Sequence, residues 1–318
     1  MIKLSENETQ IFDKIFKRII TLSDVAVINF INALFGKNFP LDSQVTHYAT
    51  ENVNGELKKT QSDSMLNING SETFHIEVEI NPNNQDMVLR IFEYGFMHAM
   101  KNKEIGKDKI KLKFPEPRVI YLEHSSSTPD KITLELDFPH QDSHEYKVPT
   151  MKFLKYSIEE LNQQNMVILL PLYLLKLRKE IDKNPTEENA KILEELINEG
   201  IIKSIDENCK VGNITPEDAK VLINLLKKLY DYLYENVEIL KEKEVAHMLA
   251  ERLILEVEVA KEIGEEIGEA RGEARGKALE KEDVARELLD MGMDIEQIMR
   301  ATKLPYNSIQ NLQMRASV

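Results

Sequence analysis

Apolar residues recur at helical spacing in two stretches near the start of the chain. Over residues 12–20 and 27–34, Phe, Ile, Val and Leu stand three or four positions apart. Gly36 and Pro40 follow the second stretch and are typical of residues that end a helix. The pattern therefore predicts a helical N-terminal region that stops before Pro40.

After Pro40 the spacing of apolar residues changes from the helical pattern to an alternation with a period of two residues. Alternating apolar and polar residues predict strands near 44–53, 58–68 and 72–80, and Asn69–Gly70 marks the turn between the last two. Helical spacing returns over residues 85–101. Later segments predict strands over 118–123, 132–138 and 146–156 and a helix over 158–180. Strands interleaved with helices indicate an α/β class.

The second half of the chain shows almost no strand pattern beyond residue 186. Thr215 and Pro216 have the character of an N-cap and a first helical position, and we expect a long helix from there toward residue 281. The most apolar run, Met166–Leu175, is ten residues long. A membrane helix needs about 20, so this run predicts a buried core helix.

Four glycines recur at steps of four within the long predicted helix, at residues 264, 268, 272 and 276. Each interior glycine costs about 1 kcal/mol relative to alanine. The repeat therefore favours a close approach of two helices and a homo-oligomer. The alternative is a repetitive, charged linker.

The end of the chain predicts three short helices, over 284–290, 295–301 and 306–314, in an order similar to a helix-turn-helix. The third carries no Lys or Arg before Arg315, which favours an oligomerisation or docking bundle over a DNA reader. The pattern divides the chain into three parts, over residues 1–182, 183–281 and 282–318.

Composition narrows the class of protein. The net charge of −14, from 41 Lys+Arg and 55 Asp+Glu, argues against a protein that coats nucleic acid or membrane by bulk charge, although a local basic site remains compatible. A single cysteine, Cys209, excludes a disulfide framework and a thiolate zinc site. Residues 1–10 lack the apolar segment of a secretion signal. We therefore expect a soluble, cytoplasmic protein.

Two glutamates stand out in the strand near 72–80. Side chains two positions apart share one face of a strand, so Glu77 and Glu79 point the same way. Like charges placed together favour a bound cation such as Mg²⁺, and the alternative is an exposed sheet face with hydrated glutamates. His75 shares this face, either as a neighbour of the site or as a strand residue facing water.

The turn before this strand supplies a test of the site. A two-residue turn would place Asp63 on the wrong face, whereas a three-residue loop would pair Ile68 with Glu72 and Asp63 with Glu77. A shared acidic site therefore predicts an odd-numbered loop with Gly70 in the left-handed region.

Lysines gather directly after the helix predicted over 85–101. The segment from Lys101 to Lys113 holds six lysines, opposed by Glu104 and Asp108. Such a loop either contacts phosphates or is an ordinary hydrated loop. The candidate DNA-binding residues are Lys101, Lys103, Lys107 and Lys109. A phosphate-binding glycine loop, a Gly-x-Ser-x-Gly elbow and a His-Glu-x-x-His spacing are absent from the sequence.

Five stretches share their order and spacing with one known family: Asp13, Phe16 and Lys17; Asp63; Glu77, Val78 and Glu79; Arg90 and Tyr94; and the glycine repeat with the tail. The first matches a D-x-x-F-K pattern, and the third stands where a Glu-x-Gln form of the (D/E)-x-K element is usual. The fourth matches R-x-x-x-Y. Together they resemble the PD-(D/E)XK nuclease family transposases, also called recombination-promoting nucleases.

The resemblance implies a restriction-endonuclease-like core, with a mixed sheet flanked by helices and an all-helical C-terminal region after it. It implies that Asp63 and Glu77 bind Mg²⁺ or Mn²⁺, with Asp13 as an outer acidic ligand. Arg90 would offset charge on the phosphate, and Tyr94 would orient water or phosphate unless it is a core residue. The implied activity is metal-dependent hydrolysis of DNA phosphodiester bonds.

Glu79 departs from the family pattern, which usually has Gln at this position, or Lys in the wider superfamily. An ionised glutamate donates no hydrogen bond and adds negative charge where DNA brings more. Either Glu79 binds a second metal, or Arg90 replaces the missing cation, or the chain cuts poorly. The alternative function is a weak or inactive nuclease-fold protein that acts as an oligomeric interaction or DNA-binding module.

Overall fold

The chain divides into two compact units, Met1–Leu253 and Ile254–Val318. A computed structural model describes residues 6–48, 51–53, 59–61, 64–80, 82, 86–241, 284–285, 288–289, 291 and 293–302. In the second unit, helix α11 covers Ile295–Thr302, as the period of the tail predicts. Asp63, the third helix of the tail and the glycine repeat at 264–276 all lie outside the described residues.

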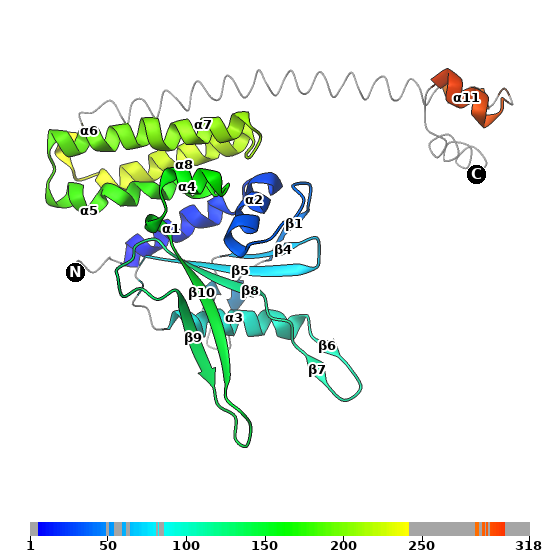
Figure 1. Cartoon of the computed structure of the whole chain (residues 1–318), viewed down its shortest axis with the longest axis horizontal. Helices are drawn as coiled ribbons and strands as arrows, with labels where there is room; N and C mark the ends of the chain where they lie inside the picture. Colours follow the sequence, from blue (N-terminus) through cyan, green and yellow to red (C-terminus); the bar gives the residue numbers. More distant parts are fainter. Residues whose placement is uncertain are drawn as a thin grey trace. The chain divides into compact units, whose positions relative to one another are not determined.

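The first unit is built on a mixed six-stranded sheet in the order β1-β4-β5-β8-β10-β9 (Figure 1). Its strands are β1 (Val45–His47), β4 (Ser64–Ile68), β5 (Glu72–Glu79), β8 (Glu116–Tyr121), β9 (Lys131–Leu136) and β10 (His144–Lys152). Strands β5, β8 and β10 run parallel, while β1, β4 and β9 pair antiparallel with their neighbours. The short strands β2 (Glu51–Val53) and β3 (Lys59–Gln61) pair with each other. An α/β class with a mixed sheet is thus confirmed.

The turn between β4 and β5 has the predicted odd length. Ile68 pairs with Glu72, and Ser64 pairs with Ile76, so three residues form the loop. Gly70 has a φ of 68°, and Asn69 before it has a φ of 52°. Asn and Gly tolerate this left-handed region better than other residues. The acidic face of β5 therefore has the register that a shared site requires.

Helices cover both faces of the sheet (Figure 1). On one face lie α1 (Glu6–Ile19) and α2 (Asp24–Phe35), which ends at Gly36 as predicted. Their apolar residues form one large core with Phe74, Ile76 and Val78 of β5. On the other face, α3 (Met87–Lys101) packs Met87 and Ile91 on Val119, Tyr121 and Val148. The even-numbered side chains of β5 therefore pack against α1 and α2, and the odd-numbered side chains face α3.

The region predicted as one helix over 158–180 is three shorter elements, and that prediction is wrong. The chain forms α4 (Ile158–Gln163), a 3₁₀ helix η2 (Val167–Leu174) and α5 (Leu175–Lys183). Asn165 has a φ of 57°, which separates α4 from η2. All eight residues of η2 are buried, as expected for the most apolar run.

Further helices continue the same large core instead of forming a separate one. They are α6 (Glu187–Glu195), a π-helical segment η3 (Leu196–Ile202), α7 (Lys203–Lys210), α8 (Pro216–Tyr234) and α9 (Glu238–Lys241); a short 3₁₀ turn η1 (Phe153–Lys155) precedes α4. Leu222, Ile223 and Leu226 of α8 are buried in the core that also holds α1, α2 and η2. The predicted boundary at residue 182 lies near the end of α5, well after the last strand β10, and the packing of the core continues across it.

Helix α8 begins as predicted and ends earlier than predicted. Thr215 caps it, Pro216 is its first residue, and Asp218 completes a capping box. The helix stops at Tyr234, so the expectation of one helix from 216 toward 281 is wrong. Asp218 also accepts hydrogen bonds from the backbone N–H of Ser23 at 2.8 Å and from the Ser23 hydroxyl, which joins the starts of α2 and α8.

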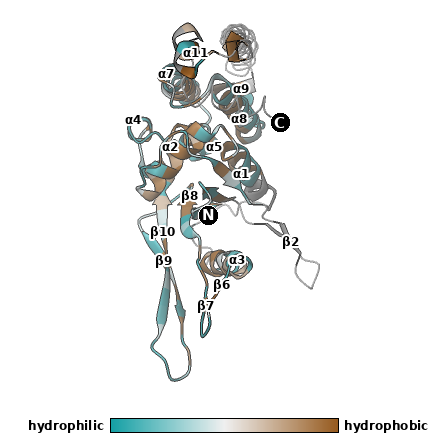
Figure 2. Cartoon of the chain, turned by 90° about the vertical axis from the view of Figure 1, so that its right-hand side faces the viewer, coloured by the Kyte–Doolittle hydropathy of each residue, from teal (hydrophilic) through white to brown (hydrophobic). Residues whose placement is uncertain are grey.

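The lysine-rich segment is a hairpin instead of an irregular loop. Strand β6 (Glu104–Ile105) pairs with β7 (Ile110–Lys111) directly after α3. This hairpin and the longer β9–β10 hairpin extend away from the helical layer of the first unit (Figures 1 and 2). In the part of the chain that the structure describes, no single helix is long and apolar enough to cross a membrane; α1 and α2 pass that test only as a pair bent by 108°.

Candidate functional site

Glu77 lies at the centre of a polar cluster between β5 and α3. Its side chain is 0% exposed, and its two oxygens accept from two different residues. Arg90 Nη2 of α3 donates to Oε2 at 2.7 Å, and His75 Nε2 lies 2.9 Å from Oε1. His75 is 1% exposed, so the interpretation of His75 as a water-facing residue is wrong and it is a neighbour of the site. The fully hydrated sheet face is likewise excluded.

Glu79 follows on the same face and is also buried, at 8% exposed. Its Oε1 accepts from the backbone N–H of Ile80 at 3.0 Å. In the parallel pairing with β8, Glu79 is opposite Tyr121. Burial, and next the charge of Glu79, raise the pKa of the Tyr121 hydroxyl. Two carboxylates and a phenol therefore share the end of β5 and β8 that lies under the start of α3.

Asp13 of α1 belongs to the same electrostatic neighbourhood. Burial raises the pKa of Asp13 above its usual value, and the nearby charges of Glu77 and Glu79 raise that pKa further. Lys17 and Arg90 oppose these effects and lower the pKa of Asp13. The side chain that the resemblance assigns as an outer acidic ligand thus responds to both glutamates of β5. Lys17, the basic residue of the D-x-x-F-K pattern, thus affects the ionisation of Asp13, the acidic residue of the same pattern.

The donor chemistry of the cluster suits a hard divalent cation, because Mg²⁺ and Mn²⁺ prefer carboxylate oxygens. Among the described residues, no three His, Cys, Asp or Glu side chains converge closely enough to hold a metal ion. Asp63, the remaining predicted ligand, lies outside those residues, one position before the pair Ser64–Ile76. The described carboxylates supply the right type of ligand, and the role of Asp63 as a further ligand stays a prediction.

Tyr94 and Arg90 both come from α3, four positions apart, so one helical face presents them together. Tyr94 is buried, and its ring lies 5.9 Å from the ring of His75, measured between centroids. The Arg90 side chain is 37% exposed, although its Nε atom is buried. Of these two predicted residues, Arg90 is placed to meet a ligand from outside, and Tyr94 packs behind the cluster.

The predicted DNA-binding lysines are in a different place from the acidic cluster. Lys101 ends α3, while Lys103, Lys107 and Lys109 lie on the β6–β7 hairpin, and all four are exposed. Arg90 and Lys101 are eleven positions apart on one helix, which corresponds to about 16 Å along its axis. The structure therefore brings together Asp13, Glu77, Glu79 and Arg90 and sets the lysines apart from them.

Sequence reasoning did not select Tyr121 as a site residue. Its hydroxyl is buried and has no hydrogen-bond partner within the described ranges. A buried unpaired hydroxyl is costly, so Tyr121 marks a position where water or a ligand atom is expected. The segment RVIYLE was predicted as a strand that contains Tyr121. Only the pairing of β8 with β5 shows that this tyrosine lies opposite Glu79.

Comparisons with protein-family models, with curated proteins and with solved structures gave no match.

Proposed function

We propose that this protein is a metal-dependent DNA endonuclease of the recombination-promoting, transposase-like type, and that it acts in the cytoplasm. The observation that carries the proposal is the burial of Glu77 and Glu79 side by side on β5, with Asp13 near both. Burying several carboxylates together opposes folding unless a cation offsets their charge. In the large sheet and its helices, the order is α1 and α2, then the antiparallel strands β1, β4 and β5, then α3 and the parallel strand β8, and this order is compatible with a nuclease-like core.

In this proposal Asp63 and Glu77 hold Mg²⁺ or Mn²⁺, and Asp13 lies behind them. The metal, when bound, would polarise the scissile phosphate and lower the pKa of an attacking water. Arg90 would turn its guanidinium from Glu77 toward the phosphate, where it offsets the growing negative charge. The Tyr121 hydroxyl would donate a hydrogen bond to the water network beside Glu79.

Nicking of a supercoiled plasmid tests the proposal. We expect the full chain to nick with Mg²⁺ and to lose at least about 100-fold in rate in Asp63→Asn and in Glu77→Gln, because each removes a charged ligand oxygen. The matched control is Glu195→Gln, an exposed glutamate at the end of α6 and outside both the acidic cluster and the hairpin, which should nick at the native rate. Equal nicking by all four proteins would indicate a contaminating nuclease and refute the assignment.

One observation favours a second candidate, a nuclease-fold module without cutting activity. Both oxygens of Glu77 already accept hydrogen bonds, from Arg90 and His75, and this arrangement is complete without a metal. If this candidate is correct, the native chain does not nick with Mg²⁺ or Mn²⁺, and neither ion raises its melting temperature. A rise in melting temperature with Mn²⁺ that is absent in Glu77→Gln would favour the nuclease.

A further inference from the structure

The β6–β7 hairpin exposes two isoleucines that face each other. Ile105 of β6 pairs directly with Ile110 of β7, and they are 72% and 62% exposed. Residues directly opposite in an antiparallel pair point to the same face, so the two side chains form one apolar patch. Gly106 N–H donates to the Lys109 carbonyl at 2.8 Å and closes the tip beyond them. Paired apolar side chains at such exposure indicate an interaction site.

Strong positive charge surrounds this apolar patch. The thirteen residues from Lys101 to Lys113 carry six lysines, one glutamate and one aspartate, a local net charge of +4 in a chain of −14. All six lysines are exposed. Lys111 Nζ lies 3.4 Å from Glu104 across the two strands, so one acid of the hairpin is already compensated. The surface therefore suits a polyanion that also offers an apolar contact.

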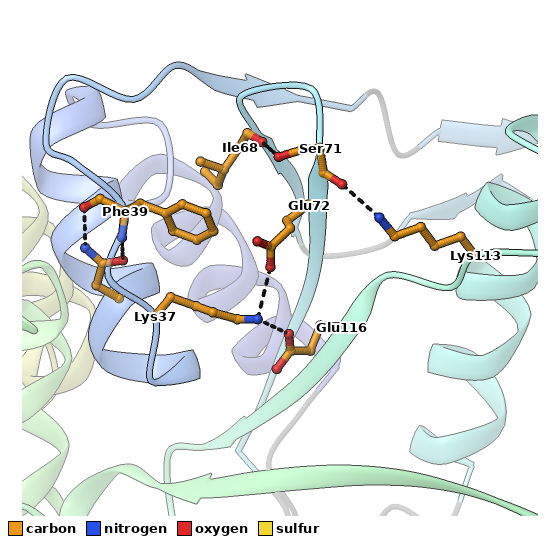
Figure 3. A network of polar contacts seen from close by, with 8 residues as sticks. Lys37, Phe39, Ile68, Ser71, Glu72, Lys113 and Glu116 are labelled. Carbon is orange, nitrogen blue, oxygen red and sulfur yellow. Dashed lines mark hydrogen bonds and ion pairs between the residues drawn. The ribbon is translucent and has the colours of Figure 1, made fainter.

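The base of the hairpin is firmly attached to the sheet and to α3. Lys113 Nζ donates to the Ser71 carbonyl at 2.9 Å, next to the ion pairs that Lys37 makes with Glu72 and Glu116 (Figure 3). The ring of Phe114 packs so closely on α3 that a Cβ added to Gly95 would lie 3.0 Å from its Cδ1 atom. A fixed base lowers the entropy lost when the tip binds.

We propose that the β6–β7 hairpin is a DNA-bending arm that enters the minor groove of duplex DNA. Its lysines contact the phosphates on both sides, while Ile105 and Ile110 insert between adjacent base pairs. Apolar wedges of this kind unstack a base step and kink the duplex by roughly 20–90°. The local charge of +4 is the reason to assign DNA as the occupant.

The inference rests on the proposed endonuclease function and adds how that enzyme holds its substrate. The hairpin starts at the end of α3 that is about 16 Å from Arg90 along the helix axis. Successive base pairs are about 3.4 Å apart, so this distance corresponds to roughly five base pairs. The base of the arm would therefore lie about half a helical turn of duplex from the phosphate that is cut.

The test measures bending and binding without cutting. A 30-base-pair duplex with a dye at each end is mixed with the full chain in EDTA, and energy transfer and anisotropy are recorded. The variants are Ile105→Ser/Ile110→Ser and Lys103→Gln/Lys107→Gln/Lys109→Gln, and the control is Val211→Ser, an equally exposed apolar residue on another element. Melting temperatures confirm that each variant folds.

We expect the native chain and Val211→Ser to bind and to raise energy transfer. The isoleucine variant should bind within about threefold of native but lose the rise in energy transfer, because the wedge is gone. The lysine variant should bind at least about tenfold more weakly, and the slope of log K against log salt should fall by about 3. Native-like bending by the isoleucine variant, an unchanged salt slope, or no duplex binding by the native chain would each overturn the proposal.

Sedimentation and nicking separate the remaining outcomes. If the native chain is an oligomer and the isoleucine variant is a monomer, the patch is a contact between copies of the chain, and the DNA-bending arm is refuted. Bending without any nicking in Mg²⁺ would support the arm while refuting the endonuclease. Nicking by a native chain that never bends the duplex would support the endonuclease while refuting the arm.

Discussion

At the scale of one residue, Glu77 and Asp13 differ in how far their neighbours compensate a buried negative charge. Glu77 is fully buried, and Arg90 and His75 each donate a hydrogen bond to one of its oxygens, with the positive charge of Arg90 next to the carboxylate. Asp13 has less compensation, because burial and two neighbouring glutamates oppose its ionisation. Keeping Asp13 ionised therefore lowers the stability of the folded chain, as is common for carboxylates at functional sites.

Asp13 gives a pH-dependent prediction. Burial raises the folded-state pKa of Asp13 above its ordinary value of 3.8, so the protonated form is favoured in the folded state. Any stability from this carboxyl is present below pH 3.8 and is lost as pH rises through the folded pKa. We therefore expect Asp13→Asn in EDTA to be more stable than native at pH 7, with an advantage that shrinks toward pH 4.

Urea denaturation at pH 4.5 and pH 7 measures the effect of Asp13→Asn. The control is Asp42→Asn, an exposed aspartate whose replacement should leave the free energy of unfolding unchanged within about 0.5 kcal/mol at both pH values. An Asp13→Asn variant that is less stable than native at pH 7 would contradict the interpretation.

The residues of the site could be predicted from sequence only in part. The alternation of side chains along a strand places His75, Glu77 and Glu79 on one face. The assumption that Asp63 and Glu77 share a site then predicts the three-residue loop with Gly70. Burial of that face depends on where α3 lies, and no local pattern specifies this. Tyr121 was missed for the same reason, since its meeting with Glu79 depends on the parallel pairing of two strands separated by α3.

At the scale of elements, helix starts were easier to predict than helix ends. Thr215, Pro216 and Asp218 form a local signal that acts within one turn, and it predicts the start of α8 correctly. No Gly or Pro follows Tyr234 in residues 235–241, so nothing in that stretch indicates the end of the helix. The run over 158–180 failed differently: apolar residues occupy every face of η2, and a run without periodicity does not distinguish helix types.

Asp218 carries a prediction about the joint between α2 and α8. Its carboxylate accepts from the backbone N–H of Thr215 at 2.9 Å and from Ser23, and it is 3% exposed. We expect Asp218→Ala to lower the free energy of unfolding by about 3 kcal/mol, because a helix cap and buried charged hydrogen bonds are lost together. Urea denaturation of the full chain measures this loss.

The matched control for this joint is Asp231→Ala on the same helix. Asp231 is exposed and pairs with Lys227 at 2.6 Å, four positions away. Such a surface pair contributes about 0.5 kcal/mol or less. Similar losses in the Asp218 and Asp231 variants would show that the joint adds nothing beyond ordinary helix stability.

At the scale of the whole molecule, the sheet and the helices after residue 182 share one hydrophobic core. Residues of α1, α2, η2 and α8 all contribute to it. We expect the full chain and a chain ending at residue 253 both to unfold cooperatively in urea. A chain ending at residue 182 should lose that cooperativity and bind the dye ANS, because the buried surface of η2 is uncovered.

The two truncated chains are compared by circular dichroism and ANS fluorescence. Each is purified and measured at the same concentration and ionic strength. A chain of residues 1–182 that unfolds cooperatively, at the same urea midpoint as residues 1–253, would show that the sheet and its two N-terminal helices fold without the later ones.

The hydrogen bonds from Ser23 to Asp218 also determine how long the start of α2 stays without its partner during synthesis on the ribosome. They join residues 195 positions apart, and a ribosome adds about 5–20 residues per second. The start of α2 therefore waits about 10–40 s for its partner after it has been synthesised. Throughout that interval the acidic cluster rests on an unfinished core, so a nascent chain carries its candidate cutting site long before that site is fully supported.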